Sequence, residues 1–197
     1  MTEIMLASAS PRRRALLSEL GWNFKAVVSY FDEVPLEGES PEAMSGRFAL
    51  GKAAEVSGRF PKALVIGADT IVVIDGEVLG KPADEKEACR MLAKLQGRSH
   101  TVMTSVSIVS SGRQLSGFVE KTDVVFRKLS EEEIKGYVAT GESLDKAGAY
   151  AIQGYGMLLV ERINGCYFNV VGLPVERLSI ELDKLGFSLN KQWGELN

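Results

Sequence analysis

The stretch from Ser8 to Arg14 reads Ser-Ala-Ser-Pro-Arg-Arg-Arg and combines residue types that could hold an anion. Serine is a good helix N-cap and proline suits the first helical position, so we expect a helix to begin at Pro11. The amino end of a helix favours acidic residues, yet three arginines stand here. Backbone N–H groups, a serine and guanidinium groups together would form a phosphate or carboxylate site. The alternative is a basic, solvated helix face.

Asp69 is an acidic residue inside an apolar segment. It interrupts the run Ala63–Ile74, whose β-branched residues favour a strand. An ionised carboxylate in such surroundings is costly to bury unless a cation or a metal ion pairs with it. Asp69 is therefore the most informative acid in the chain. The alternative is a strand-end turn in which its carboxylate only accepts hydrogen bonds from the backbone.

Lys52 falls on the apolar side of a second expected helix. Ser40 and Pro41 predict the start of that helix, and Lys52 is four residues after Phe48 and four before Val56. A lysine in that stripe must either extend its ammonium group to solvent or meet an anion.

The remaining polar candidates come from loops. The acidic loop 32–38 supplies carboxylates, Lys81 follows an expected hairpin, and the glycine-rich stretch 145–156 carries Gln153. That stretch is either a loop that lets the backbone approach a flat ligand or a bulged strand. The cations, acids and amide suited to a polyphosphate are Arg12, Arg13, Lys52, Lys81, Glu33, Asp69 and Gln153. Cleavage of a phosphoanhydride needs charge neutralisation, a divalent ion and a carboxylate that orients or deprotonates water.

Length and composition limit the classes of function. The 197 residues suffice for one domain with a substantial core, and we expect a single domain over residues 1–197 with a loosely held tail after about residue 186. A content of 45% hydrophobic and 25% charged residues is typical of a soluble globular protein. The formal net charge of −3 argues against a general nucleic-acid coat, so any phosphate-binding charge must be local.

Cysteine and histidine are too few for a zinc site. Cys89 and Cys166 lie far apart without metal-ligand spacing, and His100, the single histidine, is interpreted as structural. Any metal should be a hard ion, magnesium or manganese, held by carboxylate and phosphate oxygens. The first residues contain no apolar signal core, and no apolar run approaches the length of a membrane span. We therefore expect a cytoplasmic protein that binds neither membrane nor nucleic acid.

Strand and helix signals alternate along the chain, which predicts an α/β domain around a largely antiparallel or mixed sheet. Near the carboxyl end we expect a hairpin over residues 157–171 with its turn at Asn164-Gly165. A last helix is expected to begin at Pro174.

Taken in order, these motifs resemble those of the Maf family of nucleoside triphosphate pyrophosphatases. The similarity extends over nearly the whole chain. Its motifs are Leu6-Ala7-Ser8 with Ser10-Pro11-Arg12-Arg13, Asp32-Glu33, Lys52-Ala53, Gly67-Ala68-Asp69-Thr70, Gly80-Lys81-Pro82, Asp145–Gly154 and Val170–Pro174. The resemblance implies an elongated mixed sheet with flanking helices and a deep cleft, related to the inosine triphosphate pyrophosphatases. It also implies hydrolysis of a nucleotide to its monophosphate and pyrophosphate, a house-cleaning role and a homodimer.

Two positions indicate a branch of this family. At these two positions, Thr70 and Gln153 resemble the branch that acts on dTTP and UTP. The 7-methyl-GTP branch typically has glutamine in place of Thr70 and glutamate in place of Gln153. Gln153 offers both a donor and an acceptor to a pyrimidine edge, while a glutamate would suit a cationic methylated guanine. We therefore expect dTTP, UTP or modified pyrimidine triphosphates as substrates. The alternatives are a 7-methyl-GTP pyrophosphatase and a non-enzymatic, nucleotide-binding regulator of cell division.

The resemblance further implies roles for individual residues. Asp69 would be the proton acceptor or metal-held base, with Glu33 as its partner in holding the metal. The implied catalytic residues are Asp69, Lys52, Lys81 and Glu33. The implied phosphate-binding residues are Ser8, Arg12, Arg13, Lys52 and Lys81. The implied determinants of base preference are Arg12, Thr70 and Gln153.

Overall fold

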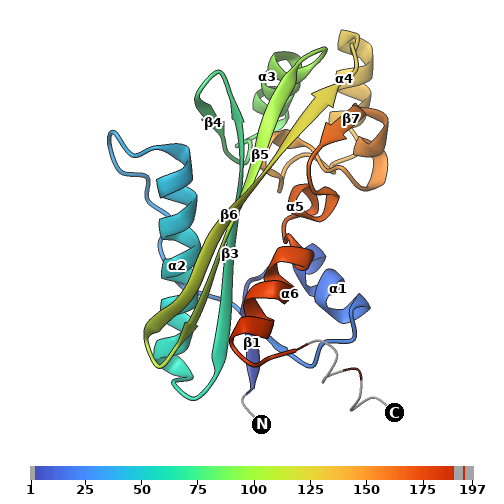
Figure 1. Cartoon of the computed structure of the whole chain (residues 1–197). Helices are drawn as coiled ribbons and strands as arrows, with labels where there is room; N and C mark the ends of the chain where they lie inside the picture. The colour runs from blue at the N-terminus through green and yellow to red at the C-terminus, as the bar shows by residue number, and fades with distance from the viewer. Residues whose placement is uncertain (1–2, 189–192, 194–197) are drawn as a thin grey trace. The chain divides into compact units, whose positions relative to one another are not determined.

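The computed structural model describes residues 3–188 and residue 193, and strands alternate with helices along much of the chain (Figure 1). The strands are β1 (Ile4–Ala7), β2 (Lys25–Val27), β3 (Leu64–Ile74), β4 (Glu77–Leu79), β5 (Ser99–Ser110), β6 (Arg113–Phe126) and β7 (Val160–Asn164). The α-helices are α1 (Pro11–Glu19), α2 (Pro41–Arg59), α3 (Glu85–Leu95), α4 (Glu131–Val138), α5 (Tyr167–Val171) and α6 (Val175–Lys184). Two 3-10 turns, η1 (Ala147–Ala149) and η2 (Gly154–Leu158), follow α4.

The strands form a seven-stranded sheet in the order β2-β1-β3-β5-β6-β7, with β4 paired to β3. Strand β1 is parallel to both β2 and β3, whereas the β3–β4 and β6–β7 pairs are antiparallel. The sheet is therefore mixed and accompanied by helices, which confirms the predicted α/β class.

The residue contacts divide the chain into two units. Unit 1 comprises residues 1–69, 104–120 and 172–197, and unit 2 comprises residues 70–103 and 121–171. Strands β3, β5 and β6 each contribute residues to both units.

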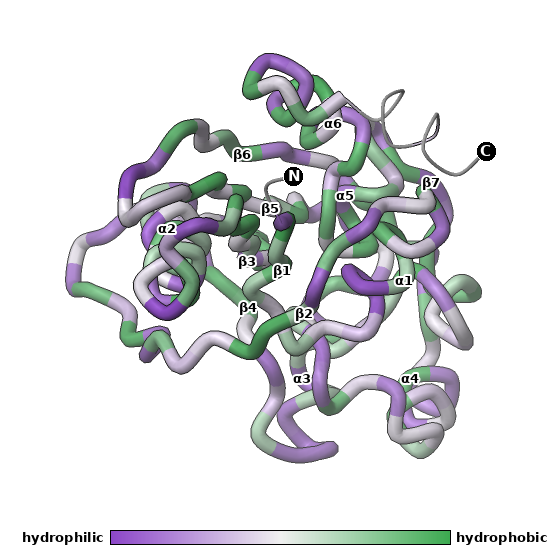
Figure 2. The backbone as a smooth tube through the Cα atoms, turned by 90° about the horizontal axis from the view of Figure 1, so that it is seen from below, coloured by the Kyte–Doolittle hydropathy of each residue, from purple (hydrophilic) through white to green (hydrophobic). Residues whose placement is uncertain are grey.

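In unit 1, β1 lies between β2 and the first half of β3, with Ala7 paired to Gly67. Helix α2 begins where the sequence predicts, because the Ser40 hydroxyl accepts a hydrogen bond from the N–H of Ala43. The helix runs alongside β3 (Figure 1), and it carries both hydrophobic and hydrophilic residues (Figure 2). The core between helix and strands contains Met5, Ala7, Ala53, Val56, Ala63, Val65 and Val109.

Gly67 allows the backbone of α2 to approach β3 closely. A Cβ atom at this position would lie 2.2 Å from the carbonyl oxygen of Ala49 and 2.8 Å from the Cβ of Ala53. Lys52 stands between these two residues on the helix, and Asp69 follows Gly67 by two residues on the strand. The close approach therefore holds the part of α2 that carries Lys52 against the part of β3 that carries Asp69.

In unit 2, helices α3 and α4 pack against each other and bury the apolar residues that the helical spacing of α3 predicts. Those residues of α3 are Ala88, Met91, Leu92 and Leu95. His100 is 3% exposed, and its Nε2 shares a 2.7 Å hydrogen bond with the hydroxyl of Tyr150. Both rings contact Phe126 edge-on, so His100 is a core residue whose hydrogen-bond partner the sequence did not indicate.

The predicted hairpin over residues 157–171 is wrong. Strand β7 pairs with β6, from Asp123 opposite Asn164 to Phe126 opposite Val160, and the second half of the predicted hairpin is helix α5. The Asn169 side chain on α5 donates hydrogen bonds to the carbonyl of Val102 and the hydroxyl of Thr122. These tertiary contacts outweigh the local turn signal, because β6 already supplies the hydrogen bonds that β7 needs.

Two further expectations concern the ends of the chain and the membrane. The expected loose tail after about residue 186 falls largely on residues 189–192 and 194–197, which lie outside the described residues. Trp193 is described, and its indole N–H donates to the carbonyl of Leu20 at 2.9 Å. Within residues 3–188 and 193, no helix combines the length and the apolar character that a membrane span requires.

Replacing Gly67 with alanine tests the close approach of α2 to β3. The added methyl group collides with backbone rather than with a movable side chain, so we expect G67A to lower the free energy of unfolding by about 1–3 kcal/mol. The matched control is Gly58, an exposed glycine in α2 with no atom near its would-be Cβ. G58A should raise stability by roughly 0.5–1 kcal/mol in urea unfolding. Equal stability of G67A and wild type would contradict the packing argument.

The buried histidine predicts acid sensitivity. Burial lowers the pKa of His100 from 6.5 to about 4, against the opposing charge of Asp123. In the unfolded chain this histidine therefore binds a proton below about pH 6.5, whereas in the folded chain it binds one only below about pH 4. The free energy of unfolding consequently falls as the pH is lowered from 6.5 to 4. We expect this histidine to cost about 2 kcal/mol of unfolding free energy between pH 7 and pH 5.

The variant H100Q isolates this effect, since its amide can still pair with the Tyr150 hydroxyl but does not titrate. Urea unfolding at pH 7 and pH 5 should show a smaller loss for H100Q than for wild type. An identical loss in both proteins would assign the acid sensitivity to other groups.

Candidate functional site

Lys52 joins two carboxylates in unit 1. Its Nζ lies 2.7 Å from Oδ1 of Asp69 and 2.9 Å from Oε2 of Glu33. The side chain of Asp69 is 9% exposed and that of Lys52 is 13% exposed, whereas Glu33 is 47% exposed. The cluster therefore has a buried half formed by Lys52 and Asp69 and an accessible carboxylate at Glu33.

This geometry decides two alternatives that the sequence leaves open. The Lys52 ammonium group meets an anion instead of extending to solvent, and Asp69 pairs with a cation instead of serving only a backbone turn. A carboxylate on a buried strand loses its hydration, and a hydrogen-bonded ammonium group compensates for that loss. The ion pair with Lys52 is therefore what allows the buried strand β3 to contain an ionised carboxylate.

Arg47 of α2 holds the part of the loop that follows Glu33. The Arg47 guanidinium group donates to both carboxylate oxygens of Glu39, at 2.8 and 2.6 Å, and to the carbonyl of Val34 at 2.9 Å. This bidentate pairing lowers the pKa of Glu39 and raises the pKa of Arg47.

Before Glu33, the same loop is attached by aromatic packing and by a second ion pair. The Phe31 ring fills the space beside Gly51, where a Cβ atom would lie 2.3 Å from the ring. Arg59 donates to the carbonyl of Val28 at 2.7 Å and pairs with Glu55. The loop is therefore held to α2 on both sides of Glu33, which places Glu33 on Lys52.

Ser8 and Arg13 lie where β1 ends. The parallel pairing of Ala7 with Gly67 brings Ser8, which is buried, to the same edge as Ala68 and Asp69. Arg13 donates to the carbonyl of Gly172 at 2.7 Å and to the carbonyl of Ala68 at 2.8 Å. Burial lowers the pKa of the Arg13 guanidinium group, and the charges of Asp69 and Glu33 oppose that shift.

These bonds give Arg13 a structural role that the sequence did not indicate. They connect α1 to β3 and to Gly172, which lies three residues before α6 begins at Val175. Its predicted contact with phosphate stays a prediction. Arg12 is half-buried in the first turn of α1, and Arg14, which follows the motif Ser10-Pro11-Arg12-Arg13, is exposed.

The other predicted site residues belong to unit 2. Thr70 follows Asp69 directly on β3 and is half-buried. Lys81 is exposed just after β4, and Gln153 is half-buried immediately before η2. The glycine-rich stretch is thus a pair of 3-10 turns and not the bulged strand that was the alternative.

Asp69 and Glu33 suit a hard divalent cation. Residues 3–188 and 193 contain no group of three or more histidine, cysteine, aspartate or glutamate side chains that could hold a metal ion. Magnesium, however, is commonly held by one or two carboxylates together with substrate phosphates. Both carboxylates already converge on one cation, the Lys52 ammonium group, so the two acids fit this mode of binding.

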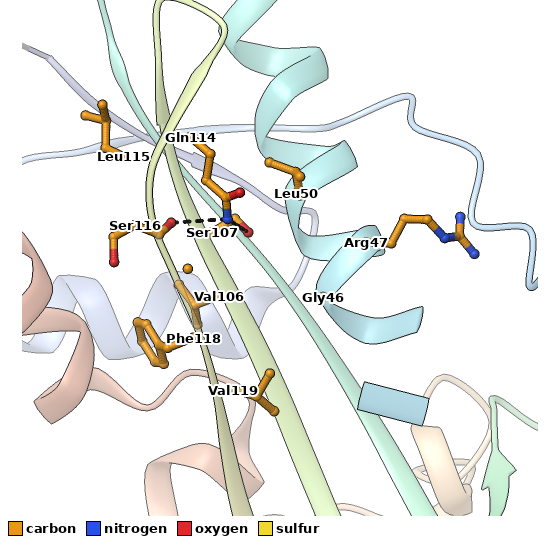
Figure 3. Close-up of a pocket in the computed structure, with 11 residues that line it drawn as sticks. Gly46, Arg47, Leu50, Val106, Ser107, Gln114, Leu115, Ser116, Phe118 and Val119 are labelled. Carbon is orange, nitrogen blue, oxygen red and sulfur yellow. Dashed lines mark hydrogen bonds between the residues drawn. The ribbon is translucent and has the colours of Figure 1, made fainter. Parts of the chain in front are cut away.

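A separate hollow of about 580 Å³ lies between α2 and strands β5 and β6 (Figure 3). Apolar side chains such as Leu50, Val106 and Phe118 line it, and the amide of Gln114 donates to the hydroxyl of Ser107 at 3.3 Å. The Arg47 side chain points away from these strands toward its partners in the loop (Figure 3). The residues that line the hollow do not include Lys52, Asp69 or Glu33, and Arg47 is the one charged residue among them.

Sequence reasoning missed the residues that position the charged cluster. Gly67 within the apolar strand and Gly51 directly before Lys52 were available signals, since an isolated glycine inside a strand or a helix indicates a close approach. Arg47 carried no comparable signal, because its partner Glu39 is eight residues away in a loop of unpredictable shape.

Comparisons with known proteins give sequence matches over nearly the whole chain. A family model described as "Maf: Maf-like protein" matches residues 3–185. A "dTTP/UTP pyrophosphatase" of Pelotomaculum thermopropionicum is 50% identical over 190 residues, which cover 96% of this chain and 100% of that protein. A "dTTP/UTP pyrophosphatase" of Symbiobacterium thermophilum is 50% identical over 189 residues, which cover 96% of this chain and 97% of that protein.

Similarity to solved structures is weaker. A nucleoside-triphosphatase / dITP/XTP pyrophosphatase from Mycobacterium abscessus aligns with 65% of this chain and 76% of its own, with a TM-score of 0.44 and 19% identity.

Removing the Lys52 ammonium group tests whether it compensates for the buried carboxylate. We expect K52M to lower the free energy of unfolding by about 2–4 kcal/mol at pH 7, because Asp69 is left buried without its cation. The double variant K52M/D69N should recover part of that loss, since an amide carries no charge. K62M, a substitution of an exposed lysine, is the control in urea unfolding. If K52M/D69N were less stable than K52M, charge compensation would not explain the pair.

Proposed function

The chain belongs to the Maf family, and we propose that it hydrolyses dTTP and UTP to the nucleoside monophosphate and pyrophosphate. The family match and the full-length relatives at 50% identity support this activity. The observation that carries it in this chain is the buried Asp69 on Lys52, with the accessible carboxylate of Glu33 beside it.

In the proposed reaction, Asp69 accepts a proton from the attacking water. The water oxygen bonds to the α-phosphorus, the bond from that phosphorus to the oxygen bridging to the β-phosphorus breaks, and pyrophosphate leaves. A carboxylate oxygen must lie within hydrogen-bond reach of the water, and the packing of β3 against α2 gives Asp69 a defined position from which to do so. Lys52 holds that position and supplies positive charge near the phosphoryl oxygens.

The phosphate-binding roles form part of the same proposal. Arg12 stands at the amino end of α1, where backbone N–H groups and the helix dipole favour an anion. Ser8 precedes that helix at the end of β1. Arg13 and Lys81 take phosphate-binding roles from the family resemblance, as does Lys52.

Asp69 and Glu33 are the residues that would hold a divalent ion. Magnesium or manganese, when bound, would neutralise phosphate charge and polarise the scissile bond. The support for this proposal is that both carboxylates approach a single cation, Lys52.

Base preference is assigned to Arg12, Thr70 and Gln153. Gln153 offers one donor and one acceptor to the edge of a uracil or thymine ring, which matches the activity in the relatives' names. We further propose a cytoplasmic homodimer that acts as one enzyme domain, on the family resemblance. The presence of Cys89 and Cys166 as free thiols is consistent with a reducing compartment.

A nucleotide panel with magnesium or manganese tests the proposal through release of pyrophosphate. We expect dTTP and UTP to be turned over faster than 7-methyl-GTP, and D69N to lose about 10²–10⁴-fold in kcat because it cannot accept the proton. Near-normal pyrophosphate release by a folded D69N would contradict the role of Asp69. Faster turnover of 7-methyl-GTP would indicate the other branch, and binding of dTTP without pyrophosphate release would indicate the regulator.

A further inference from the structure

Glu142 is a half-buried carboxylate of unit 2 that the proposed mechanism does not use. It lies in the turn after α4 and accepts three hydrogen bonds, two of them from the backbone of η2. The N–H of Tyr155 donates to Oε2 at 3.0 Å, and the N–H of Gly156 donates to Oε1 at 3.0 Å. The hydroxyl of Tyr137 donates to Oε1 at 2.9 Å. Both carboxylate oxygens are therefore engaged in holding one turn.

Tyr137 extends this hold to the other side of Gln153. Its hydroxyl accepts a hydrogen bond from the N–H of Ala151 at 3.2 Å while it donates to Glu142. Backbone groups at 151, 155 and 156 are thus tied to one carboxylate and one hydroxyl. Gln153 lies within the segment that these bonds bracket.

The glycines within residues 151–156 show how closely the backbone of this segment packs against Glu142. Gly154 has a φ of +67°, and a Cβ atom there would lie 2.1 Å from Oε2 of Glu142. A Cβ atom at Gly156 would lie 2.0 Å from the carbonyl oxygen of Ala151. The sequence Gln-Gly-Tyr-Gly therefore permits a turn that wraps around a carboxylate, and a side chain at either glycine would open it.

The Gln153 side chain has no such attachment of its own. None of the described residues forms a hydrogen bond with its carboxamide. The place from which this amide can reach a ligand is consequently set by its backbone, and the backbone is set by Glu142 and Tyr137. A displaced amide loses the paired donor and acceptor alignment that distinguishes one base edge from another.

We propose that Glu142, supported by Tyr137, is a positioning residue for base selection that acts through Gln153. The inference rests on the proposed function, in which Gln153 contacts the pyrimidine. Glu142 touches no substrate in this role, because its two oxygens face the backbone of η2 and the Tyr137 hydroxyl.

The variant E142Q tests the role with almost no change of shape. An amide replaces one acceptor oxygen by an NH₂ group, which must then face an N–H or O–H donor. We expect the ratio of kcat/KM for UTP to that for CTP to fall about tenfold, chiefly through a higher KM for UTP, which corresponds to about 1.4 kcal/mol. The matched control is E131Q on α4, whose side chain is 85% exposed. E131Q should keep the wild-type ratio.

A double-mutant cycle identifies Gln153 as the route of the effect. With Q153A as the background, adding E142Q should change the UTP to CTP ratio no further. If E142Q instead lowered kcat/KM equally for both nucleotides, or if its effect on the ratio added fully to that of Q153A, the positioning role would be overturned. Wild-type protein that released no pyrophosphate from UTP would overturn the proposed function itself, so the two failures are distinguishable.

Amide hydrogen exchange supplies a readout that is independent of activity. The N–H groups of Tyr155 and Gly156 should exchange faster in E142Q than in wild type or E131Q, because their acceptors are lost or reversed. Y137F, which removes the hydroxyl but keeps the ring, should accelerate exchange at Ala151. Unchanged exchange across residues 151–156 in a folded E142Q would refute the attachment of the turn to Glu142.

Discussion

The hydrogen-bonded pair of Lys52 and Asp69 is the interaction on which the rest of unit 1 depends. An acid on a buried strand requires a cation at hydrogen-bond distance, and a lysine can provide one only if its helix lies against that strand. Gly67 meets this requirement by letting the backbone of α2 touch β3. The chemistry and the packing therefore depend on each other. Without the close contact of helix and strand, the buried carboxylate of Asp69 would lack a cation. Without Asp69, the Lys52 ammonium group would lack its buried anion.

The accessible carboxylate is positioned by a different means. Glu33 belongs to a loop, and loops hold a side chain only when their backbone is anchored. Here α2 holds the loop on both sides of Glu33. Arg59 and the space beside Gly51 hold the part of the loop before Glu33, and Arg47 holds the part after it. A single helix thus carries the lysine and also binds the loop that delivers the second acid.

Unit 2 uses a carboxylate for the opposite purpose. In unit 1 an ammonium group compensates for the charge of Asp69, whereas Glu142 satisfies its oxygens with backbone N–H groups and a tyrosine hydroxyl. The first arrangement preserves a reactive group in a buried place. The second one shapes a glycine-rich turn and so gives a defined position to Gln153, whose carboxamide forms no hydrogen bond with any of the described residues.

Much of this protein can be predicted from the sequence, because caps, turn residues and apolar periodicity are local signals. They predicted the starts of α1 and α2, the mixed α/β class, the place of Lys52 on the apolar side of its helix and the unusual Asp69. The predicted hairpin over residues 157–171 failed, since β7 finds its partner in β6 and α5 is held by Asn169, neither of which is a local property. In the same way, only the tertiary structure decided that Lys52 meets both Asp69 and Glu33, that Arg13 bonds to carbonyl groups and that Glu142 holds the turn after Gln153. Residue types determine which charges need partners, but which partner satisfies each charge depends on distances that arise only when segments far apart in the chain pack together.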